Sequence, residues 1–256
     1  MTKPTLLMKP RLLMKQLLPA VALTLGLLVA GQPAARAEGG EQLMASGSNV
    51  RDQASLQRGA KLFFNYCVGC HSLKYMRYSR IADDLGLTEQ QVMQNLNFTG
   101  AKFDDPVISH MPAEDATKWF GKDPPDLSLE VSAKTADWVY TYLNTFYLDP
   151  KSPIGWNNTT LPNAAMPFPL WELQGQQTAV MKPGTDEVEK LDLAHPGKLT
   201  PAQYQQASRD LVNFLEYVSE PAALQRHDYG VWVVLFLALF TLLAYFLKKE
   251  YWKDVH

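Results

Sequence analysis

Cysteine is scarce in this sequence, with two residues in 256, and positive charge is not in excess. A structural zinc site needs further cysteine or histidine at ligand spacing, and the chain has no other cysteine. The formal net charge is −2, so the basic character of nucleic-acid-binding proteins is missing and no nucleic-acid partner is expected. Internal repeats and low-complexity tracts are also missing. With 46% hydrophobic residues, one or two globular domains plus membrane segments are expected.

Both cysteines fall in one short motif, in which Cys67 and Cys70 are followed directly by His71. The pattern C-x-x-C-H is typical of c-type haem attachment. Two thiols three positions apart can each form a thioether with one porphyrin vinyl group, and the adjacent histidine can bind the iron. The alternative, a thioredoxin-like dithiol, needs a βαβ context that this sequence does not indicate. We therefore predict one covalently attached haem c per chain and no structural disulfide.

The N-terminus has the three parts of a secretory signal peptide. Basic residues up to Lys15 precede an apolar stretch over residues 17–30, and an A-x-A pattern follows at residues 35–37. We expect residues 1–37 to be a signal peptide and residues 38–229 to form an exported c-type haem domain; an uncleaved anchor helix is the alternative. The exported part carries 16 Lys and Arg against 24 Asp and Glu, a formal charge of −8.

A second apolar run, residues 230–247, contains 18 residues without a charge. As a helix it would span about 27 Å, close to the hydrocarbon thickness of a bilayer. Trp232 lies near one end, and Lys248 and Lys249 follow the other, so the positive-inside rule assigns the tail, residues 248–256, to the cytoplasm. We expect a single-pass protein of the inner (cytoplasmic) membrane whose haem domain lies on the periplasmic side.

Apolar periodicity predicts a mainly α domain. A helical pattern from Leu56 to Cys67 leads into the haem motif. Capping boxes or helical spacing indicate three more helices, beginning at Thr88, Thr135 and Thr200. Three segments have the composition of loops or of an exposed hairpin: residues 98–130, 149–169 and 176–199. The expected fold is a c-type cytochrome domain with long loop insertions and one C-terminal transmembrane helix.

A haem that only carries electrons is usually closed on both faces, and a methionine opposite the histidine raises its potential. Met111 and Met166 are the leading candidates, because each precedes a proline that stiffens its loop. Met166 lies in the more rigid setting, between small residues and prolines. On these residues alone both methionines stay open, with His110, His195 and His227 as alternatives.

Several short motifs follow one another in a set order: Cys67 to His71, Tyr75 to Tyr78, Pro124 to Ser128, Ala136 to Tyr140 and Ala165 to Pro167. In this set, and in the single C-terminal apolar run, the chain resembles the cytochrome c1 family, the haem subunits of bacterial cytochrome bc1 complexes (ubiquinol–cytochrome c reductases). The resemblance covers essentially the whole mature chain and implies that Met166 is the sixth ligand. It further implies electron transfer from a Rieske iron–sulfur protein to a soluble cytochrome c, with cytochrome b as membrane partner and no bond chemistry in this chain.

The chain departs from the family in one respect. The family often has an arginine near a haem propionate shortly after the Pro-Pro-Asp-Leu-Ser segment, whereas the nearest basic residue after that segment here is Lys134. Arg77 and Arg80 are candidate propionate partners, but a solvated helix face explains them equally well.

Two other functions stay open: the haem subunit of another respiratory complex, and a peroxidase or gas-sensing haem protein with an open iron position. No catalytic acid–base constellation stands out near the motif, which weighs against peroxidase chemistry. Acidic residues gather in the segments 104–105, 114–115 and 123–126. These segments form either a docking face for a basic soluble cytochrome c or a generic solvated surface.

Overall fold

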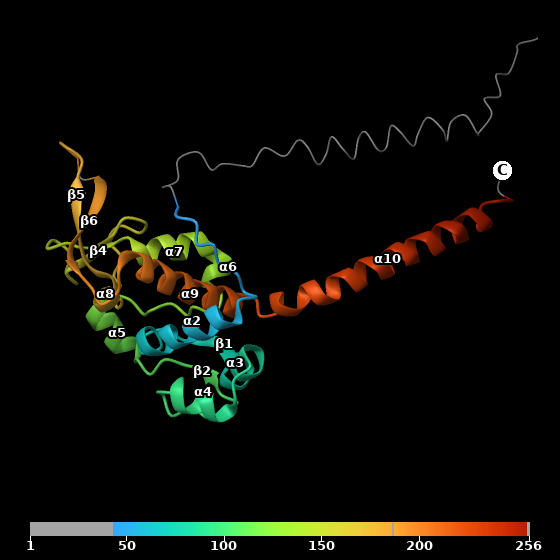
Figure 1. Ribbon diagram of the computed structural model, residues 1–256, viewed down its shortest axis with the longest axis horizontal. Helices are drawn as coiled ribbons and strands as arrows, with labels where there is room; N and C mark the ends of the chain where they lie inside the picture. The colour runs from blue at the N-terminus through green and yellow to red at the C-terminus, as the bar shows by residue number, and fades with distance from the viewer. Residues whose placement is uncertain (1–42, 186, 255–256) are drawn as a thin grey trace, which may run out of the picture. The chain divides into compact units, whose positions relative to one another are not determined.

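The structure is a computed structural model that describes residues 43–185 and 187–254 (Figure 1). The predicted signal peptide, residues 1–37, lies outside the described residues. About half of the described residues are helical, which confirms the mainly α prediction.

Nine helices are present in the described part of the chain: α2 (Gln53–Tyr66), α3 (Tyr78–Leu85), α4 (Glu89–Asn95), α5 (Ala113–Phe120), α6 (Glu130–Lys134), α7 (Ala136–Asn144), α8 (Trp171–Gln174), α9 (Pro201–Ser219) and α10 (Ala223–Tyr251). The strands are β1 (Leu73–Arg77), β2 (Pro106–Val107), β3 (Phe146–Leu148), β4 (Trp156–Asn158), β5 (Gly175–Met181) and β6 (Val188–Pro196). Strands β1 and β2 pair antiparallel, and the other four form a sheet in the order β4-β3-β5-β6, with β3 and β5 parallel.

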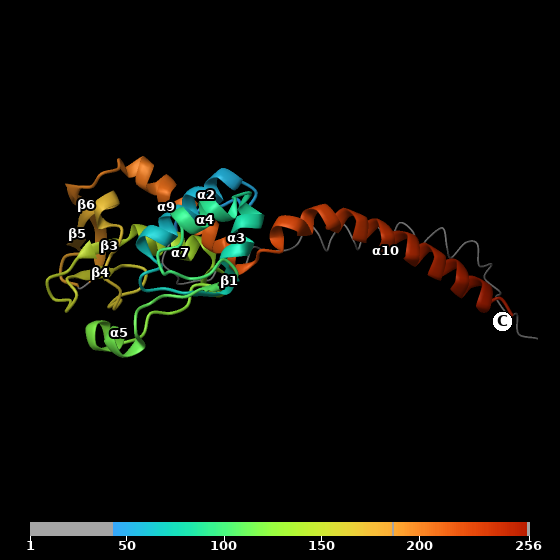
Figure 2. The same ribbon diagram turned by 90° about the horizontal axis from the view of Figure 1, so that it is seen from below.

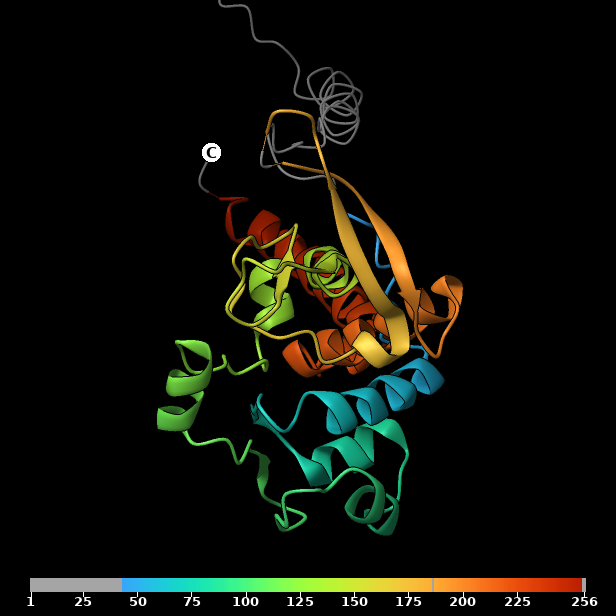
Figure 3. The same ribbon diagram turned by 90° about the vertical axis from the view of Figure 1, so that its left-hand side faces the viewer.

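The core of the domain forms where α2 and α9 pack side by side (Figures 1 and 3). Gly59 permits this approach, because a Cβ atom there would lie 2.0 Å from the carbonyl oxygen of Asp210. Phe63 of α2 packs on Phe214 of α9, with ring centroids 5.8 Å apart. Next to this contact, the Arg58 guanidinium donates two hydrogen bonds to the Asp210 carboxylate, at 2.6 and 2.9 Å. The end of α2, which carries the haem motif, is therefore held on a buried helix pair.

Several predicted elements are confirmed. Helix α2 leads directly into the motif, and both capping boxes are present, at Thr88 with Gln91 and at Thr200 with Gln203. In each box the threonine side chain accepts from the N3 main chain while the glutamine side chain accepts from the threonine N–H. The segment 176–199 forms the long β5–β6 hairpin, which Figure 3 shows.

The loop prediction for residues 98–130 is wrong in part, because α5 lies within it. Proline and glycine suggested a loop there, but they bracket the helix: Pro112 is its N-cap, and Gly121 ends it with a φ of 78°. Only Ala116 of α5 is buried and the helix has only eight residues, so its apolar pattern is too short to stand out from the surrounding prolines and glycines. In Figure 2, α5 lies at the edge of the domain, away from α2 and α9.

Two other boundaries differ from the prediction for related reasons. The helical spacing from Thr135 onward predicts a helix through about Tyr147, but α7 ends at Asn144 and the next residues form β3. The predicted loop 149–169 contains the short strand β4, which pairs with β3. The apolar residues that follow α7 thus serve a strand rather than a last helical turn.

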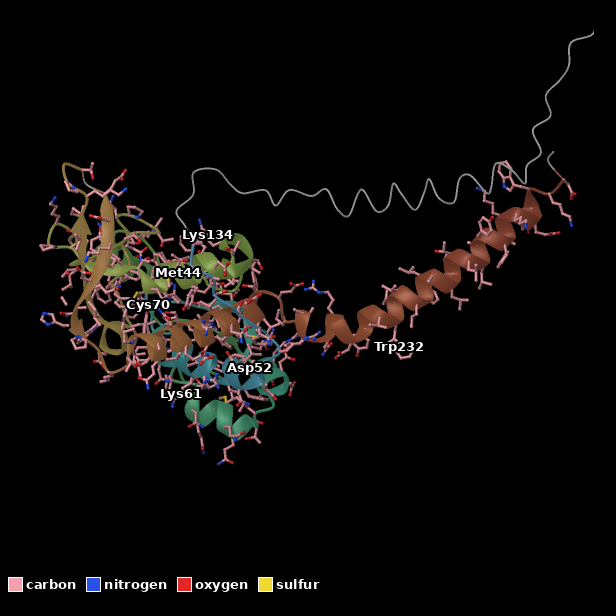
Figure 4. The ribbon with its side chains drawn as sticks, turned by 45° about the horizontal axis from the view of Figure 1, so that its top comes forward. Met44, Asp52, Lys61, Cys70, Lys134 and Trp232 are labelled. Carbon is pink, nitrogen blue, oxygen red and sulfur yellow. The ribbon has the colours of Figure 1, made fainter. Side chains whose placement is uncertain are left out.

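Within α10, the segment Asp228–Tyr251 is long and apolar enough to cross a membrane, and none of it is buried within the structure. The predicted span, residues 230–247, lies inside it. Trp232, labelled in Figure 4, is 72% exposed, as an interfacial anchor would be. Helix α10 begins at Ala223, before the apolar run, so the residues that precede the run are part of the same continuous helix.

Candidate functional site

One cleft of the domain brings together all four predicted site residues: Cys67, Cys70, His71 and Met166. The cleft encloses about 1210 Å³, part of it open to solvent. Its walls come from the end of α2 and the motif, from residues 120–130, from α7, from the loop 161–169 and from α9. Most of the lining side chains are apolar, a composition that suits a large hydrophobic cofactor.

Main-chain hydrogen bonds shape the motif into a tight turn at the end of α2. The Cys67 N–H donates to the Phe63 carbonyl at 2.8 Å, which ends the helix. The N–H groups of Cys70 and His71 then donate to the Cys67 carbonyl at 3.0 and 2.8 Å. This turn brings both thiols and the imidazole to one side of the chain, facing the cleft.

A main-chain carbonyl fixes the orientation of the His71 ring. Its Nδ1 lies 2.8 Å from the Pro125 carbonyl oxygen, which can only accept, so Nδ1 carries the proton. Nε2 then keeps its lone pair, the form of histidine that binds a metal. Burial lowers the pKa of His71, although the bond to Pro125 opposes this effect. The ring is therefore held neutral, with one nitrogen available toward the cleft.

The two thiols are free and poorly activated. Burial raises the pKa of Cys67 to about 12 and also raises the pKa of Cys70. A redox dithiol needs a lowered thiol pKa, so this environment argues against a thioredoxin-like role. Within residues 43–185 and 187–254, no group of three His, Cys, Asp or Glu is placed to hold a metal ion.

The loop that carries Met166 is built on two buried asparagines of β4. The Asn158 side-chain oxygen accepts from the main-chain N–H groups of residues 160 and 161, at 2.9 and 3.1 Å. The Asn157 side-chain oxygen accepts from the N–H of Asn163 at 2.8 Å. Asn163 itself has a φ of 61°, a conformation that asparagine tolerates better than most residues. Side-chain amides thus replace regular secondary structure in positioning this loop.

Helix α7 contributes an aromatic wall beside Met166. Trp138 and Tyr142 stack with their ring centroids 5.2 Å apart and an interplanar angle of 9°. The Tyr142 hydroxyl donates a hydrogen bond to the Met166 sulfur at 3.5 Å. The sequence showed Tyr142 only as one residue of an apolar helical pattern, so this polar contact could not be predicted.

Other candidates from the sequence lie elsewhere. Met111 does not line the cleft. Arg77 donates to the Asp104 carbonyl, and Arg80 forms an ion pair with Asp84 at 2.9 Å. Neither arginine lines the cleft, so both are poor partners for a cofactor bound there.

The charged residues that do line the cleft are Lys122 and Glu130, and neither was predicted. Lys134 instead lies outside the cleft, with its ammonium 5.3 Å from the ring centroid of Trp138. The position of Lys122, two residues before the Pro-Pro-Asp-Leu-Ser segment, was the available signal.

The chemistry of these groups fits a c-type haem. An imidazole with a free Nε2 and a thioether sulfur are ligands of a haem that carries electrons. Two thiols beside the imidazole can provide the covalent links, and apolar walls can cover the porphyrin.

Comparison with known proteins identifies the family of this chain. The model of the Cytochrome C1 family matches residues 46–255. A cytochrome c1 of Allochromatium vinosum is 51% identical over 223 residues, which cover 85% of this chain and 91% of that protein. An ammonia monooxygenase gamma subunit of Nitrosomonas europaea is 44% identical over 205 residues, covering 80% and 85%. A cytochrome c1 of Blastochloris viridis is 27% identical over 92% of this chain and 95% of its own. With the family model matching nearly all of the described residues, the chain belongs to the Cytochrome C1 family.

Proposed function

We propose that this chain is the electron-carrying haem subunit of a quinol–cytochrome c oxidoreductase, a cytochrome bc1 complex. Cys67 and Cys70 would hold one haem c covalently, and His71 and Met166 would be the ligands of its iron. The observation that carries the proposal is that these four residues line one apolar cleft in a member of this family. When bound, the haem supplies a one-electron couple.

The residues of this chain hold and shield the cofactor and perform no bond chemistry. His71, held by Pro125, presents Nε2 from one wall, and Met166 presents its sulfur from the other. With both ligands in place, the iron would have no open position for a substrate or a gas. The electron arrives from a Rieske iron–sulfur protein and leaves to a basic soluble cytochrome c, while cytochrome b is the membrane partner.

The proposed placement follows from the two apolar runs. Residues 1–37 direct export, and the haem domain functions in the periplasm. Helix α10 anchors it in the inner membrane, with Lys248 and Lys249 in its last turn on the cytoplasmic side. This arrangement keeps the haem near the quinol-oxidising subunits while leaving it accessible to a soluble acceptor.

A second candidate function is favoured by one relative. The Nitrosomonas europaea protein carries the name of an ammonia monooxygenase subunit and is 44% identical to this chain. On this alternative, the same haem domain serves a monooxygenase assembly in place of a quinol–cytochrome c oxidoreductase. The difference would lie in the partner subunits and not in the haem site.

Purification of the intact membrane complex tests the proposal. We expect the chain to co-purify with a cytochrome b that holds two b-type haems and with a Rieske iron–sulfur protein, and quinol to reduce its haem. Co-purification with monooxygenase subunits and without b-type haem would favour the second candidate. Carbon monoxide provides an independent check, because rapid binding to the reduced native protein would reveal an open iron position.

A further inference from the structure

Tyr142 makes a polar contact inside an otherwise apolar part of the cleft. Its hydroxyl donates to the Met166 sulfur at 3.5 Å. A thioether is a weak acceptor, and an exposed tyrosine hydroxyl would find water instead. A tyrosine hydroxyl carries its proton at neutral pH, so it can act as a donor. The contact therefore reflects the placement of the two side chains.

The tyrosine ring is held on two sides. Trp138, one helical turn before it, stacks on one face at 5.2 Å. Phe146 meets the ring edge-to-face, with centroids 4.8 Å apart and an interplanar angle of 68°. Aromatic pairs in these geometries are favourable beyond their buried area. The hydroxyl thus has a fixed position relative to α7.

One buried amide links the tyrosine to the methionine loop. The Asn158 side-chain nitrogen donates to the Tyr142 carbonyl at 2.8 Å, while its side-chain oxygen accepts from the N–H groups of residues 160 and 161. Asn158 is fully buried. The main chain of Tyr142 and the loop that leads to Met166 therefore share one anchor, which keeps the hydroxyl and the sulfur in register.

We propose that Tyr142 is a positioning residue for Met166, and that its hydroxyl also tunes the electron affinity of the site. A thioether sulfur has two lone pairs, so Met166 can accept the hydrogen bond with one and bind the iron with the other. The hydrogen bond withdraws electron density from the sulfur and makes it a weaker donor, which favours the reduced iron. The inference rests on the proposed function, namely that Met166 is an axial ligand.

Tyr142→Phe in the full complex tests the proposal, because it removes only the hydroxyl and preserves the stacked ring. The readout is a redox titration of the haem. We expect the ferric–ferrous equilibrium to shift toward ferric by a factor of about 2 to 10, the range that one hydrogen bond is worth. If Tyr142→Phe does not accumulate, Tyr142→Leu should shift the equilibrium in the same direction, since the surrounding wall is apolar.

Tyr140→Phe is the matched control. Tyr140 lies on the same helix and is buried, but its ring faces the Arg209 guanidinium at 6.0 Å and does not line the cleft. It should leave the redox equilibrium unchanged. An unchanged equilibrium in Tyr142→Phe, or an equal shift in Tyr140→Phe, would overturn the proposal.

The same substitution in a Met166→Leu background shows whether the hydroxyl acts through the sulfur. We expect Tyr142→Phe to cause no further shift there, because its partner is gone. An equal shift in both backgrounds would contradict the proposal. Failure of the underlying function has a different signature: Met166→Leu alone would then leave the haem spectrum unchanged.

Discussion

The two walls of the cleft are built in different ways. The wall that carries His71 uses residues that are neighbours in sequence, and main-chain atoms hold them: the turn closes on Cys67, and the Pro125 carbonyl orients the imidazole. The wall that carries Met166 has no regular structure at the ligand, and buried side-chain amides of Asn157 and Asn158 hold its loop. The first wall is held by main-chain carbonyls, while the second is held by side-chain amides.

This difference predicts how each wall responds to substitution. Loss of a motif residue removes a covalent link or ligand, for which nothing nearby can substitute. Loss of a supporting residue on the other wall changes an equilibrium, because the loop can still close at a cost. The effects should therefore fall from near-complete loss at the first wall to graded shifts at the second.

The largest effect is expected from the double substitution Cys67→Ala and Cys70→Ala. It removes both thiols, so no thioether can form and the haem should leave the chain on denaturation. Haem staining of a denaturing gel measures this directly, with each single variant beside the double. A normally stained double variant would show that the haem is attached elsewhere or not covalently.

Met166→Leu should have the next largest effect. A hydrocarbon cannot bind iron, so the haem stays attached but its potential falls markedly, and reduced protein should gain carbon monoxide binding. Met111→Leu is the control, because Met111 does not line the cleft. If Met111→Leu changes the spectrum and potential while Met166→Leu does not, the ligand assignment is wrong.

Asn158→Ala should produce a graded effect on the same wall. It leaves the N–H groups of residues 160 and 161 without their acceptor, at a cost of about 2 kcal/mol. The open form of the loop should then become roughly 30-fold more populated. Carbon monoxide binding to the reduced protein measures that population.

Asn97→Ala is the matched control for this substitution. Asn97 also anchors a turn through its side chain, donating to the Ala101 carbonyl and accepting from the Thr99 N–H, but it does not line the cleft. Equal carbon monoxide binding in the two variants would mean that the amide of Asn158 has no special role at the site.

The smallest effect concerns the rim that both walls share. We use the term acidic rim for Glu114 and Asp115, which lie in the first turn of α5; the last residue of this helix, Phe120, lines the cleft. Neutralising both acids should slow electron transfer to a basic soluble cytochrome c by a factor of about 2 to 3 at low salt, and the difference should vanish at high salt. Stopped-flow rates across a salt series measure it.

Neutralising Glu187 and Glu189 is the control for the rim. These acids lie on or beside the β5–β6 hairpin and do not line the cleft. Rates that respond equally to both pairs, or to neither, would mean that overall charge and not the rim guides the acceptor.

The contrast between the walls also explains what could be predicted from the sequence. The spacing of Cys67, Cys70 and His71 predicts a haem site from only five consecutive residues. Helix α2 was predicted from apolar periodicity. Met166 needed the resemblance to a family, because from the residues alone Met111 was an open alternative. The support of its loop could not be predicted: Asn158 bonds to Tyr142, sixteen positions away, through side-chain geometry that no periodic pattern encodes.

Helix α5 illustrates a related difficulty. Periodicity detects helices by the face they bury, and α5 buries only Ala116. Pro112 and Gly121 mark the two ends of α5. Each of these residues taken alone is also typical of a loop, so the pair was not interpreted as the start and end of a helix. Glu114 and Asp115 of the acidic rim were therefore identified as part of a possible docking face, but they were expected to lie in a loop and not in a helix.

The packing of α2 on α9 affects the order of events during folding. The hydrogen bond from Ser55 to Asp210 spans 155 positions, so the two helices can meet only after nearly the whole domain has been synthesised. Contacts this distant in sequence make folding slow, because closing the intervening loop costs entropy before the contacts form. Cys67, which is 9% exposed in the folded domain, is accessible to solvent in the unfolded chain. If a haem is attached at Cys67, as proposed, we expect attachment to be easier before α2 and α9 pack together than after.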